Sequence, residues 1–215
     1  MMAVYDLEEQ EQISELKAWW TQYGNLVVTL AVVAALAAVG WQGWNWYQNR
    51  NAEAAGMLYY AVQQAAEKQD AQQAREAAGR LIGEHGGSVS AQLGALLSAA
   101  LQFETGDLAN ARAQLEWAAD KGRDAALRDL ARLRLAAVLL QQGEHDAALA
   151  RLQAAPLAAY KSRFDDLRGD ILAAQGKSAE ARAAWQAAID SLALEGEEAV
   201  SLREVVRVKL ESLGV

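Results

Sequence analysis

A long stretch without any charged side chain constrains this fold more than any other feature. No Asp, Glu, Lys or Arg lies between Lys17 and Arg50, and an apolar run from Leu26 to Gly40 lies within that stretch. A helix from residue 26 to residue 46 would be roughly 30 Å long, close to the hydrocarbon thickness of a bilayer. The pattern therefore predicts one transmembrane helix, which we place at residues 24–47.

Two groups of aromatic residues flank the apolar run: Trp19, Trp20 and Tyr23 before it, and Trp41, Trp44, Trp46 and Tyr47 at its end. Trp and Tyr are enriched at the headgroup level of membranes. A cleaved signal peptide would begin with basic residues and have a shorter apolar run, whereas this chain begins with an acidic segment. A buried helix of a soluble domain would have to cover aromatics at both ends. We therefore favour an uncleaved span.

Small residues recur along the predicted span. Their spacing would allow another membrane helix to approach closely. The alternative is that alanine merely fills a membrane helix, and the sequence does not decide between the two. The candidate contact residues are Ala31, Ala34, Ala35, Ala38, Gly40 and Gly43.

The charge balance excludes several classes of function. The net charge is −8, and the first 25 residues carry five acids and one lysine. Residues 1–23 thus form an acidic tail, and no basic patch for nucleic acid or polybasic lipid anchor is expected. The chain has no cysteine, which excludes disulfides and cysteine metal sites. One basic residue close to each end of the span leaves its orientation open.

The part after residue 50 repeats itself. Gly106, Gly143 and Gly176 are spaced 37 and 33 residues apart, and Gln69 takes the equivalent place in a weaker, earlier copy. Each glycine is expected to end one helix in a left-handed conformation just before the next helix begins. The positions that match between the three copies are Ala99, Ala136 and Gly169, then Ala111, Ala148 and Ala181, then Leu115, Leu152 and Trp185, and finally Ala118, Ala155 and Ala188.

This pattern resembles the tetratricopeptide repeat, a helix–turn–helix unit of about 34 residues that stacks into a solenoid. A generic alanine-rich helical bundle is the alternative, but the positions matched in three copies favour the repeat. We therefore expect an all-α chain with a single N-terminal transmembrane helix and a tetratricopeptide-repeat-like α-solenoid at 48–215. Residues 197–213 have apolar residues at helical spacing and predict a capping helix at the end of the solenoid.

Solenoids of this kind offer a concave surface that is usually lined by the first helix of each hairpin. The apolar candidates could instead belong to the core, an alternative that the sequence leaves open. The candidate partner-binding groove consists of Leu96, Ala100, Phe103, Leu133, Ala137, Leu140, Asp166 and Asp170.

No catalytic pattern is recognisable in the sequence. His85 and His145 fall in separate predicted turns, without a nearby cysteine or a paired carboxylate. Carboxylates and arginines alternate at helical spacing near residue 166, which favours a salt-bridged face over an acid/base pair. These residues are Arg163, Asp165, Asp166, Arg168 and Asp170. We expect neither an enzyme nor a cofactor.

Several segments together resemble the YfgM family of ancillary subunits of the bacterial SecYEG translocon. They are the acidic 6–11, Leu16 to Trp20 with Tyr23 and Gly24, Gly40 and Trp41 with Trp44 and Tyr47, Asp166 to Asp170, Gly176 with Ala181 to Trp185, and Val208 to Leu210 with Leu213. The resemblance covers the whole chain, and the combination of tail, Trp-marked span and Asp-Leu-Arg-Gly-Asp is specific.

The resemblance implies a single-pass protein of the bacterial inner membrane, with residues 1–23 in the cytoplasm and residues 48–215 in the periplasm. It implies association with the SecYEG translocon and the periplasmic chaperone PpiD, where the repeat domain would act as a scaffold or chaperone for unfolded secretory clients. Two alternatives remain: a structural adaptor in another cell-envelope complex, and a regulator that acts through its cytoplasmic tail.

Overall fold

The computed structural model describes residues 3–194, 196 and 199–212, and for residues 3–12, 48 and 49 it describes the backbone alone. All regular elements of the described residues are helical, which confirms the all-α prediction. In chain order they are α1 (Ala3–Glu67), α2 (Ala71–His85), α3 (Val89–Glu104), α4 (Leu108–Lys121), α5 (Ala125–Gln141), α6 (His145–Arg151), the short 3-10 helix η1 (Ala158–Tyr160), α7 (Lys161–Ala174), α8 (Ser178–Leu192) and α9 (Val200–Ser212).

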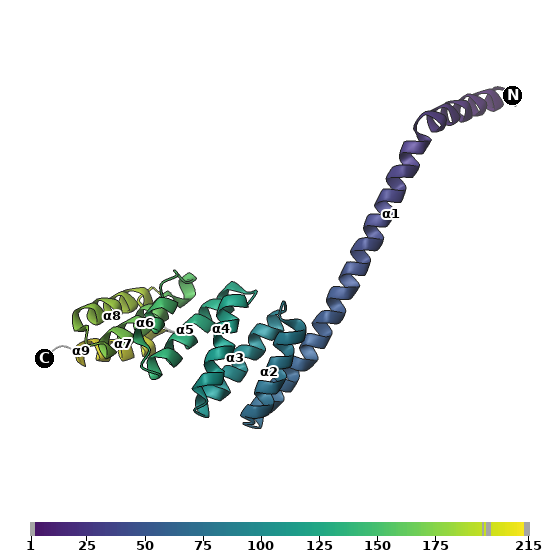
Figure 1. The fold of residues 1–215 in the computed structure, drawn as a ribbon. Helices are drawn as coiled ribbons and strands as arrows, with labels where there is room; N and C mark the ends of the chain where they lie inside the picture. Colours follow the sequence, from purple (N-terminus) through teal and green to yellow (C-terminus); the bar gives the residue numbers. More distant parts are fainter. Residues whose placement is uncertain (1–2, 195, 197–198, 213–215) are drawn as a thin grey trace. The chain divides into compact units, whose positions relative to one another are not determined.

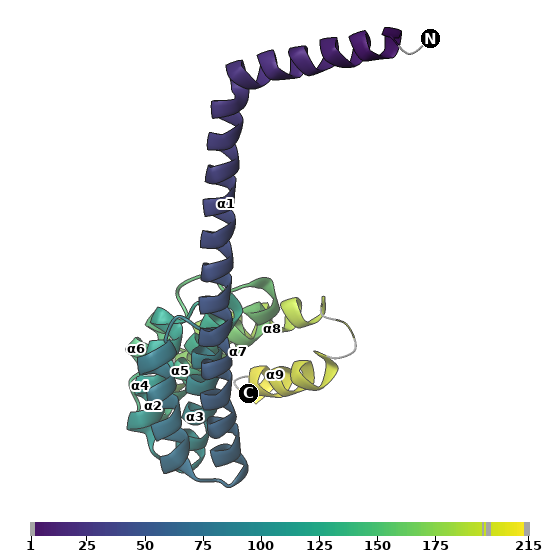
Figure 2. The ribbon, with the colours of Figure 1, turned by 90° about the vertical axis from the view of Figure 1, so that its right-hand side faces the viewer.

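From Ala52 onward the helices pair into hairpins that stack in chain order (Figures 1 and 2). The last part of α1 packs on α2 through Ala55 and Leu81, and the pairs α3–α4, α5–α6 and α7–α8 follow. The first helices of neighbouring hairpins also touch, α3 against α5 and α5 against α7. This arrangement is the helix–turn–helix solenoid that the repeat predicts.

The turns within the hairpins share one backbone conformation. Gly106, Gly143 and Gly176 have positive φ angles of 82°, 77° and 75°, as their spacing predicts, and Gln69 has a φ of 55° in the first hairpin. In each turn the residue after this position donates its backbone N–H to a carbonyl five residues earlier, for example Asp107 to Gln102 at 2.8 Å. These bonds satisfy carbonyls at the helix ends.

Gln69 therefore occupies a position that suits glycine. A residue with a Cβ costs roughly 1–2 kcal/mol in the left-handed region. Glycine avoids this cost, but it makes the unfolded chain more flexible, so more conformational entropy is lost on folding. We expect Gln69→Gly to stabilise the repeat domain by about 0.5–1 kcal/mol, and Gly106→Ala to destabilise it by about 1 kcal/mol. Urea denaturation of the full chain in detergent micelles, followed by circular dichroism, measures both. Equal effects of the two substitutions would contradict this explanation.

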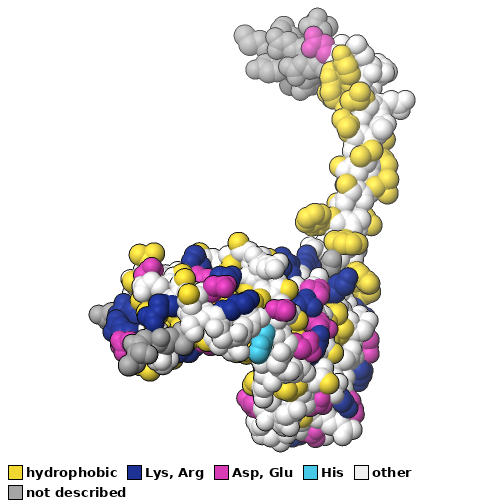
Figure 3. All heavy atoms as spheres, turned by 60° about the vertical axis from the view of Figure 1, so that its left-hand side comes forward, with side chains coloured by type: hydrophobic (Ala, Val, Ile, Leu, Met, Phe, Trp, Pro, Cys, Tyr) yellow, Lys and Arg dark blue, Asp and Glu magenta, His cyan; other side chains and the backbone are white. Residues whose placement is uncertain are grey.

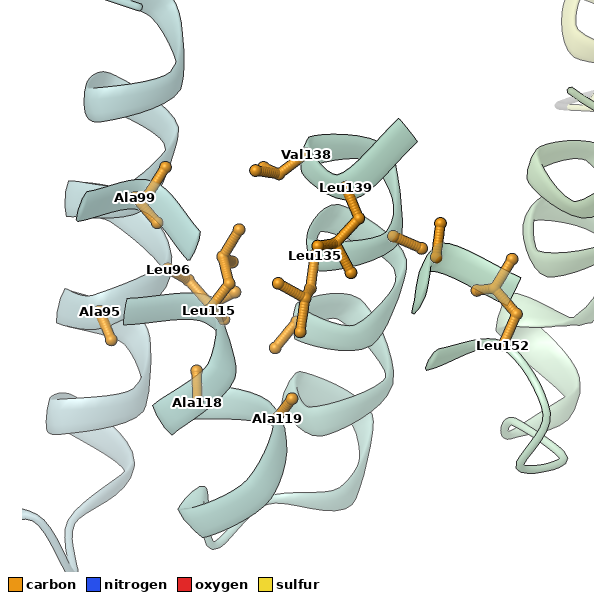
Figure 4. Packing of buried hydrophobic residues seen from close by; sticks show 14 of the residues in the cluster. Ala95, Leu96, Ala99, Leu115, Ala118, Ala119, Leu135, Val138, Leu139 and Leu152 are labelled. Carbon is orange, nitrogen blue, oxygen red and sulfur yellow. The ribbon is translucent and has the colours of Figure 1, made fainter. Parts of the chain in front are cut away.

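The core lies between successive hairpins and is built largely of alanine and leucine. Figure 4 shows side chains of α3, α4 and α5 pointing toward one another, among them Leu96, Leu115 and Leu135. Each of these three leucines is at most 3% exposed. Small residues at fixed positions let the helices approach closely, and the leucines fill the space that remains.

One position departs from the repeat pattern. Ala111, Ala148 and Ala181 are all fully buried, but Ala155 is exposed rather than packed like its counterparts Ala118 and Ala188. The reason is that α6 ends at Arg151, before it reaches Ala155. Pro156 follows at once, and a proline disfavours helical conformation in the residue before it.

The α9 helix packs against α8 at the end of the stack. Leu202, Val206 and Leu210 face the cluster around Trp185, whereas Val200, Val205 and Val208 are exposed. The apolar spacing of this segment thus includes three valines that do not reach the core. Leu213, which belongs to the same pattern, lies outside the described residues.

Residues 1–51 form a unit of their own, whose described backbone belongs to α1. In the part of the chain that the structure describes, one helix is long and apolar enough to cross a membrane, and it contains the whole predicted span. Its side chains from Leu26 to Val39 are nearly all exposed (Figure 3). A helix that is apolar on all sides and not covered by protein is typical of a membrane span.

Candidate partner-binding groove

A hollow of about 240 Å³ lies between the first helices of two neighbouring hairpins. Four of its lining residues come from α3, three from α5 and one from α4. We call it the α3–α5 pocket, and its residues are Ala99, Ala100, Phe103, Glu104, Leu115, Arg134, Ala137 and Val138.

Alanines create this pocket. Ala100 on α3 and Ala137 on α5 are half-buried, and Ala99 beside them is buried, so three of the lining side chains are short. Leu115, 2% exposed, contributes from α4, and Phe103, 38% exposed, supplies an aromatic wall. The volume falls below the roughly 300–1,000 Å³ of typical small-molecule sites. The pocket suits a single apolar side chain of a partner better than a cofactor.

Two charged residues complete the lining. Arg134 donates a hydrogen bond from Nη1 to the carbonyl oxygen of Leu96 at 3.3 Å, and Glu104 lies at the end of α3. The pocket is therefore apolar with one guanidinium and one carboxylate. Its lining contains no hydroxyl, thiol or imidazole group.

Three of the eight groove residues predicted from the sequence line this pocket: Ala100, Phe103 and Ala137. Leu96 is 3% exposed and belongs to the core, while Leu133 and Leu140 are partly buried and pack against that core. Glu104 and Arg134 were not among the predicted groove residues. Glu104 lies four residues after Ala100 and Arg134 lies three residues before Ala137, and this helical spacing was the signal that could have indicated them.

The other two predicted groove residues hold the end of the stack. Lys209 of α9 donates hydrogen bonds of 2.8 Å to Asp166 and to Asp170 of α7. These carboxylates therefore bind α9. Within the row of alternating charges, Arg168 does pair with Asp165 at 2.6 Å, whereas Asp166 and Asp170 pair with a lysine 43 and 39 residues further along the chain.

The Asp-Leu-Arg-Gly-Asp segment joins three neighbouring elements. Arg168 donates to the carbonyl of Leu152 at 2.8 Å, which fixes the end of the third hairpin. Gly169 leaves room for the indole of Trp185, and a Cβ there would collide with that ring. Trp185 in turn donates to Asp170 at 3.1 Å. The Asp-Leu-Arg-Gly-Asp segment is thus a structural junction, at which α7 is joined to α8, to α9 and to the end of α6.

The junction affects two protonation equilibria. Burial raises the pKa of Asp166, an effect that Lys209 only partly offsets. Burial acts to lower the pKa of Lys209, but its hydrogen bonds to Asp166 and Asp170 outweigh burial and raise that pKa above its ordinary value. Lys209 therefore stays protonated, and bridges both carboxylates, throughout the neutral range.

The raised pKa of Lys209 predicts that the repeat domain loses stability at alkaline pH. A lysine whose pKa is raised by folding stabilises the fold below its unfolded pKa of about 10.5, and loses that contribution as the pH rises through the folded pKa. We expect α9 to loosen above about pH 10.5. Lys209→Arg should reduce this loss, because arginine stays protonated there. Amide hydrogen exchange in α9, compared between the two proteins at pH 8 and 11, measures it; identical pH profiles would contradict the role of Lys209.

The small residues of the predicted span lie on the exposed surface of α1. Ala31, Ala34, Ala35 and Ala38 are all exposed, and nothing lies within 4 Å of a Cβ placed at Gly40 or Gly43. No described residue of the chain covers this strip, so it stays a predicted contact for another helix.

Among the described residues, no group of three or more His, Asp or Glu side chains is arranged to hold a metal ion. His85 ends α2 and His145 begins α6. The expectation that the chain is not an enzyme stays a prediction.

Comparison with known proteins agrees with this architecture. Residues 17–215 match the family described as tetratricopeptide repeat-like domain. The chain is 33% identical to the ancillary SecYEG translocon subunit of Neisseria gonorrhoeae over 211 residues, which cover 96% of this chain and 98% of the relative. It is 29% identical to the protein of the same name from Escherichia coli, over all of both chains. A relative of that name from Haemophilus influenzae is 27% identical over 187 residues, which cover 87% of this chain and 91% of the relative.

Proposed function

The chain belongs to the family of ancillary SecYEG translocon subunits with a tetratricopeptide repeat-like domain, and on this basis we propose that it assists protein translocation as a membrane-anchored binding protein. Residues 24–47 would anchor it in the bacterial inner membrane, with the N-terminus in the cytoplasm and the repeat domain in the periplasm. The apolar, exposed part of α1 supports the anchor. The orientation rests on the family resemblance, and a topology reporter fused after Val215 tests it.

In this proposal the repeat domain binds proteins and catalyses nothing. It would contact the translocon and the chaperone PpiD, and receive unfolded secretory chains as they emerge. The observation that carries the binding role is the α3–α5 pocket, an apolar hollow on the first helices of two adjacent hairpins. Unfolded chains expose apolar side chains, and Phe103 offers an exposed aromatic surface for them.

Crosslinking during secretion tests the pocket. A photoreactive residue placed at Phe103 should form adducts with secreted chains, PpiD or translocon subunits. Val89, at the start of the same α3, is 44% exposed and lies outside the pocket, so it serves as the matched control. Adducts at neither position, or equal adducts at both, would count against the proposed site.

Filling the pocket supplies a second variant. Ala137 is half-buried, so Ala137→Leu adds a bulky side chain to the pocket at a place where part of it can reach solvent. We expect this substitution to reduce the Phe103 adducts several-fold while circular dichroism of the protein stays unchanged. Undiminished adducts in a folded variant would show that clients bind elsewhere.

A further inference from the structure

The segment before the predicted span has a different surface from the span itself. At 100° per residue, its large apolar residues fall within one arc of about 120° of the helix, and its polar residues occupy the rest. The apolar set is Ile13, Leu16, Trp19, Trp20 and Tyr23, each between 42% and 67% exposed. The rest of the helix surface carries Glu15 and Lys17 beside the two edges of the arc, and Ser14, Ala18, Thr21 and Gln22 between them.

The helix α1 bends in its N-terminal part. The purple N-terminal part of α1 runs in a different direction from the part that follows it (Figures 1 and 2). Thr21 donates its hydroxyl to the carbonyls of Lys17 and Ala18 at 3.1 and 2.8 Å, and such bonds back to the preceding turn bend helices. Gly24 follows, and a Cβ there would lie only 3.1 Å from the indole nitrogen of Trp20.

We propose that residues 13–23 form an interfacial helix, which lies along the membrane surface and places its apolar arc at the boundary between headgroups and acyl chains. The inference rests on the proposed membrane span. The occupant of the apolar face is the bilayer, because the face continues directly into a helix that is apolar all round. Three of its five members are Trp or Tyr, the residues that favour this depth.

The charges favour a zwitterionic phospholipid surface. Lys17 is the only basic residue in the first 49, and it lies at the edge of the apolar arc, where its apolar stem can follow the surface and its ammonium can reach a phosphate. Glu15 lies at the other edge of the apolar arc, beside Trp19, so that one carboxylate and one ammonium flank the apolar face. A single lysine provides too little charge to depend on anionic lipid.

Because the chain contains no cysteine, single-cysteine variants need no prior substitution. The full chain, reconstituted in phosphatidylcholine vesicles, receives a nitroxide label at one position per variant. Ile13→Cys and Leu16→Cys report on the apolar arc, Ser14→Cys and Gln22→Cys report on the polar face, and Leu30→Cys reports on the span. Collision with oxygen measures access to lipid, and collision with a nickel chelate measures access to water.

The expected result is a helical alternation. Oxygen collisions should dominate at residues 13 and 16 and nickel collisions at residues 14 and 22, although the four positions alternate along the chain. A steady increase in lipid access from residue 13 to residue 22 would instead show that the span simply continues, and would overturn the proposal. Water access at residues 13, 14, 16 and 22, with residue 30 in lipid, would overturn the interfacial helix in favour of a protein partner. Water access at residue 30 as well would refute the membrane span itself.

Discussion

Replacing Gly169 with alanine is expected to destabilise the repeat domain by about 1–3 kcal/mol, as overpacking of a well-filled core does. In the interior of a helix the same change normally stabilises, by roughly 0.5–1 kcal/mol. At Gly169 the new methyl group would meet the indole of Trp185. That ring is 4% exposed and donates a hydrogen bond to Asp170, so it cannot move aside without breaking the junction.

Gly79 provides the matched control. It lies in the interior of α2, it is exposed, and nothing lies within 4 Å of a Cβ placed there. Gly79→Ala should therefore stabilise by about 0.5–1 kcal/mol, with the opposite sign to Gly169→Ala. Adding Trp185→Phe to Gly169→Ala should recover part of the loss, because the smaller ring leaves room for the methyl group. Urea denaturation of the full chain measures all three, and a stabilising Gly169→Ala would refute the packing argument.

The repeat could be predicted from the sequence because its period is carried by residues with a physical role. Gly106, Gly143 and Gly176 occupy left-handed turns, and the same register identified the turn at Gln69, although the residue type there gives no such signal. Ala155 could not be placed in this way. Whether α6 continues beyond Arg151 depends on competition between its packing and Pro156, and the period contains no information on that competition.

The groove was less predictable, because the first helix of a hairpin has two apolar sides. Leu96 and Ala100 are four residues apart on α3, yet Leu96 is in the core and Ala100 lines the pocket. Arg134 lies on the neighbouring hairpin, where its three-residue spacing to Ala137 was the one signal for it, and its hydrogen bond to the carbonyl of Leu96 on α3 could not be predicted from spacing. The same holds for Asp166 and its partner Lys209, which belong to different helices.

A second large effect is expected at Gln92, a fully buried polar residue of α3. Its amide nitrogen donates to the carbonyls of Ala118 and Asp124 at 3.1 and 3.2 Å, and its amide oxygen accepts from the N–H of Asp124 at 2.9 Å. It therefore fixes the loop between the second and third hairpins. Gln92→Leu would keep the size of the side chain but leave these backbone groups without partners, at an expected loss of about 2–4 kcal/mol.

Gln102, also on α3, is the graded control for this prediction. It is 2% exposed and donates one hydrogen bond, to the carbonyl of Ala71 at 2.6 Å, so Gln102→Leu should cost clearly less than Gln92→Leu. Equal losses would mean that burial, and not the number of bonds, determines the effect.

Gly122 tests the same loop from its other side. A Cβ at this position would collide with the Gln92 amide and with the Ala118 carbonyl, so Gly122→Ala should displace the side chain that Gln92→Leu removes. The two substitutions break the same bonds, and their combined loss in urea denaturation should be smaller than the sum of the separate losses. Strict additivity would show that Gly122 and Gln92 act independently, and that the loop between these hairpins is held by other contacts.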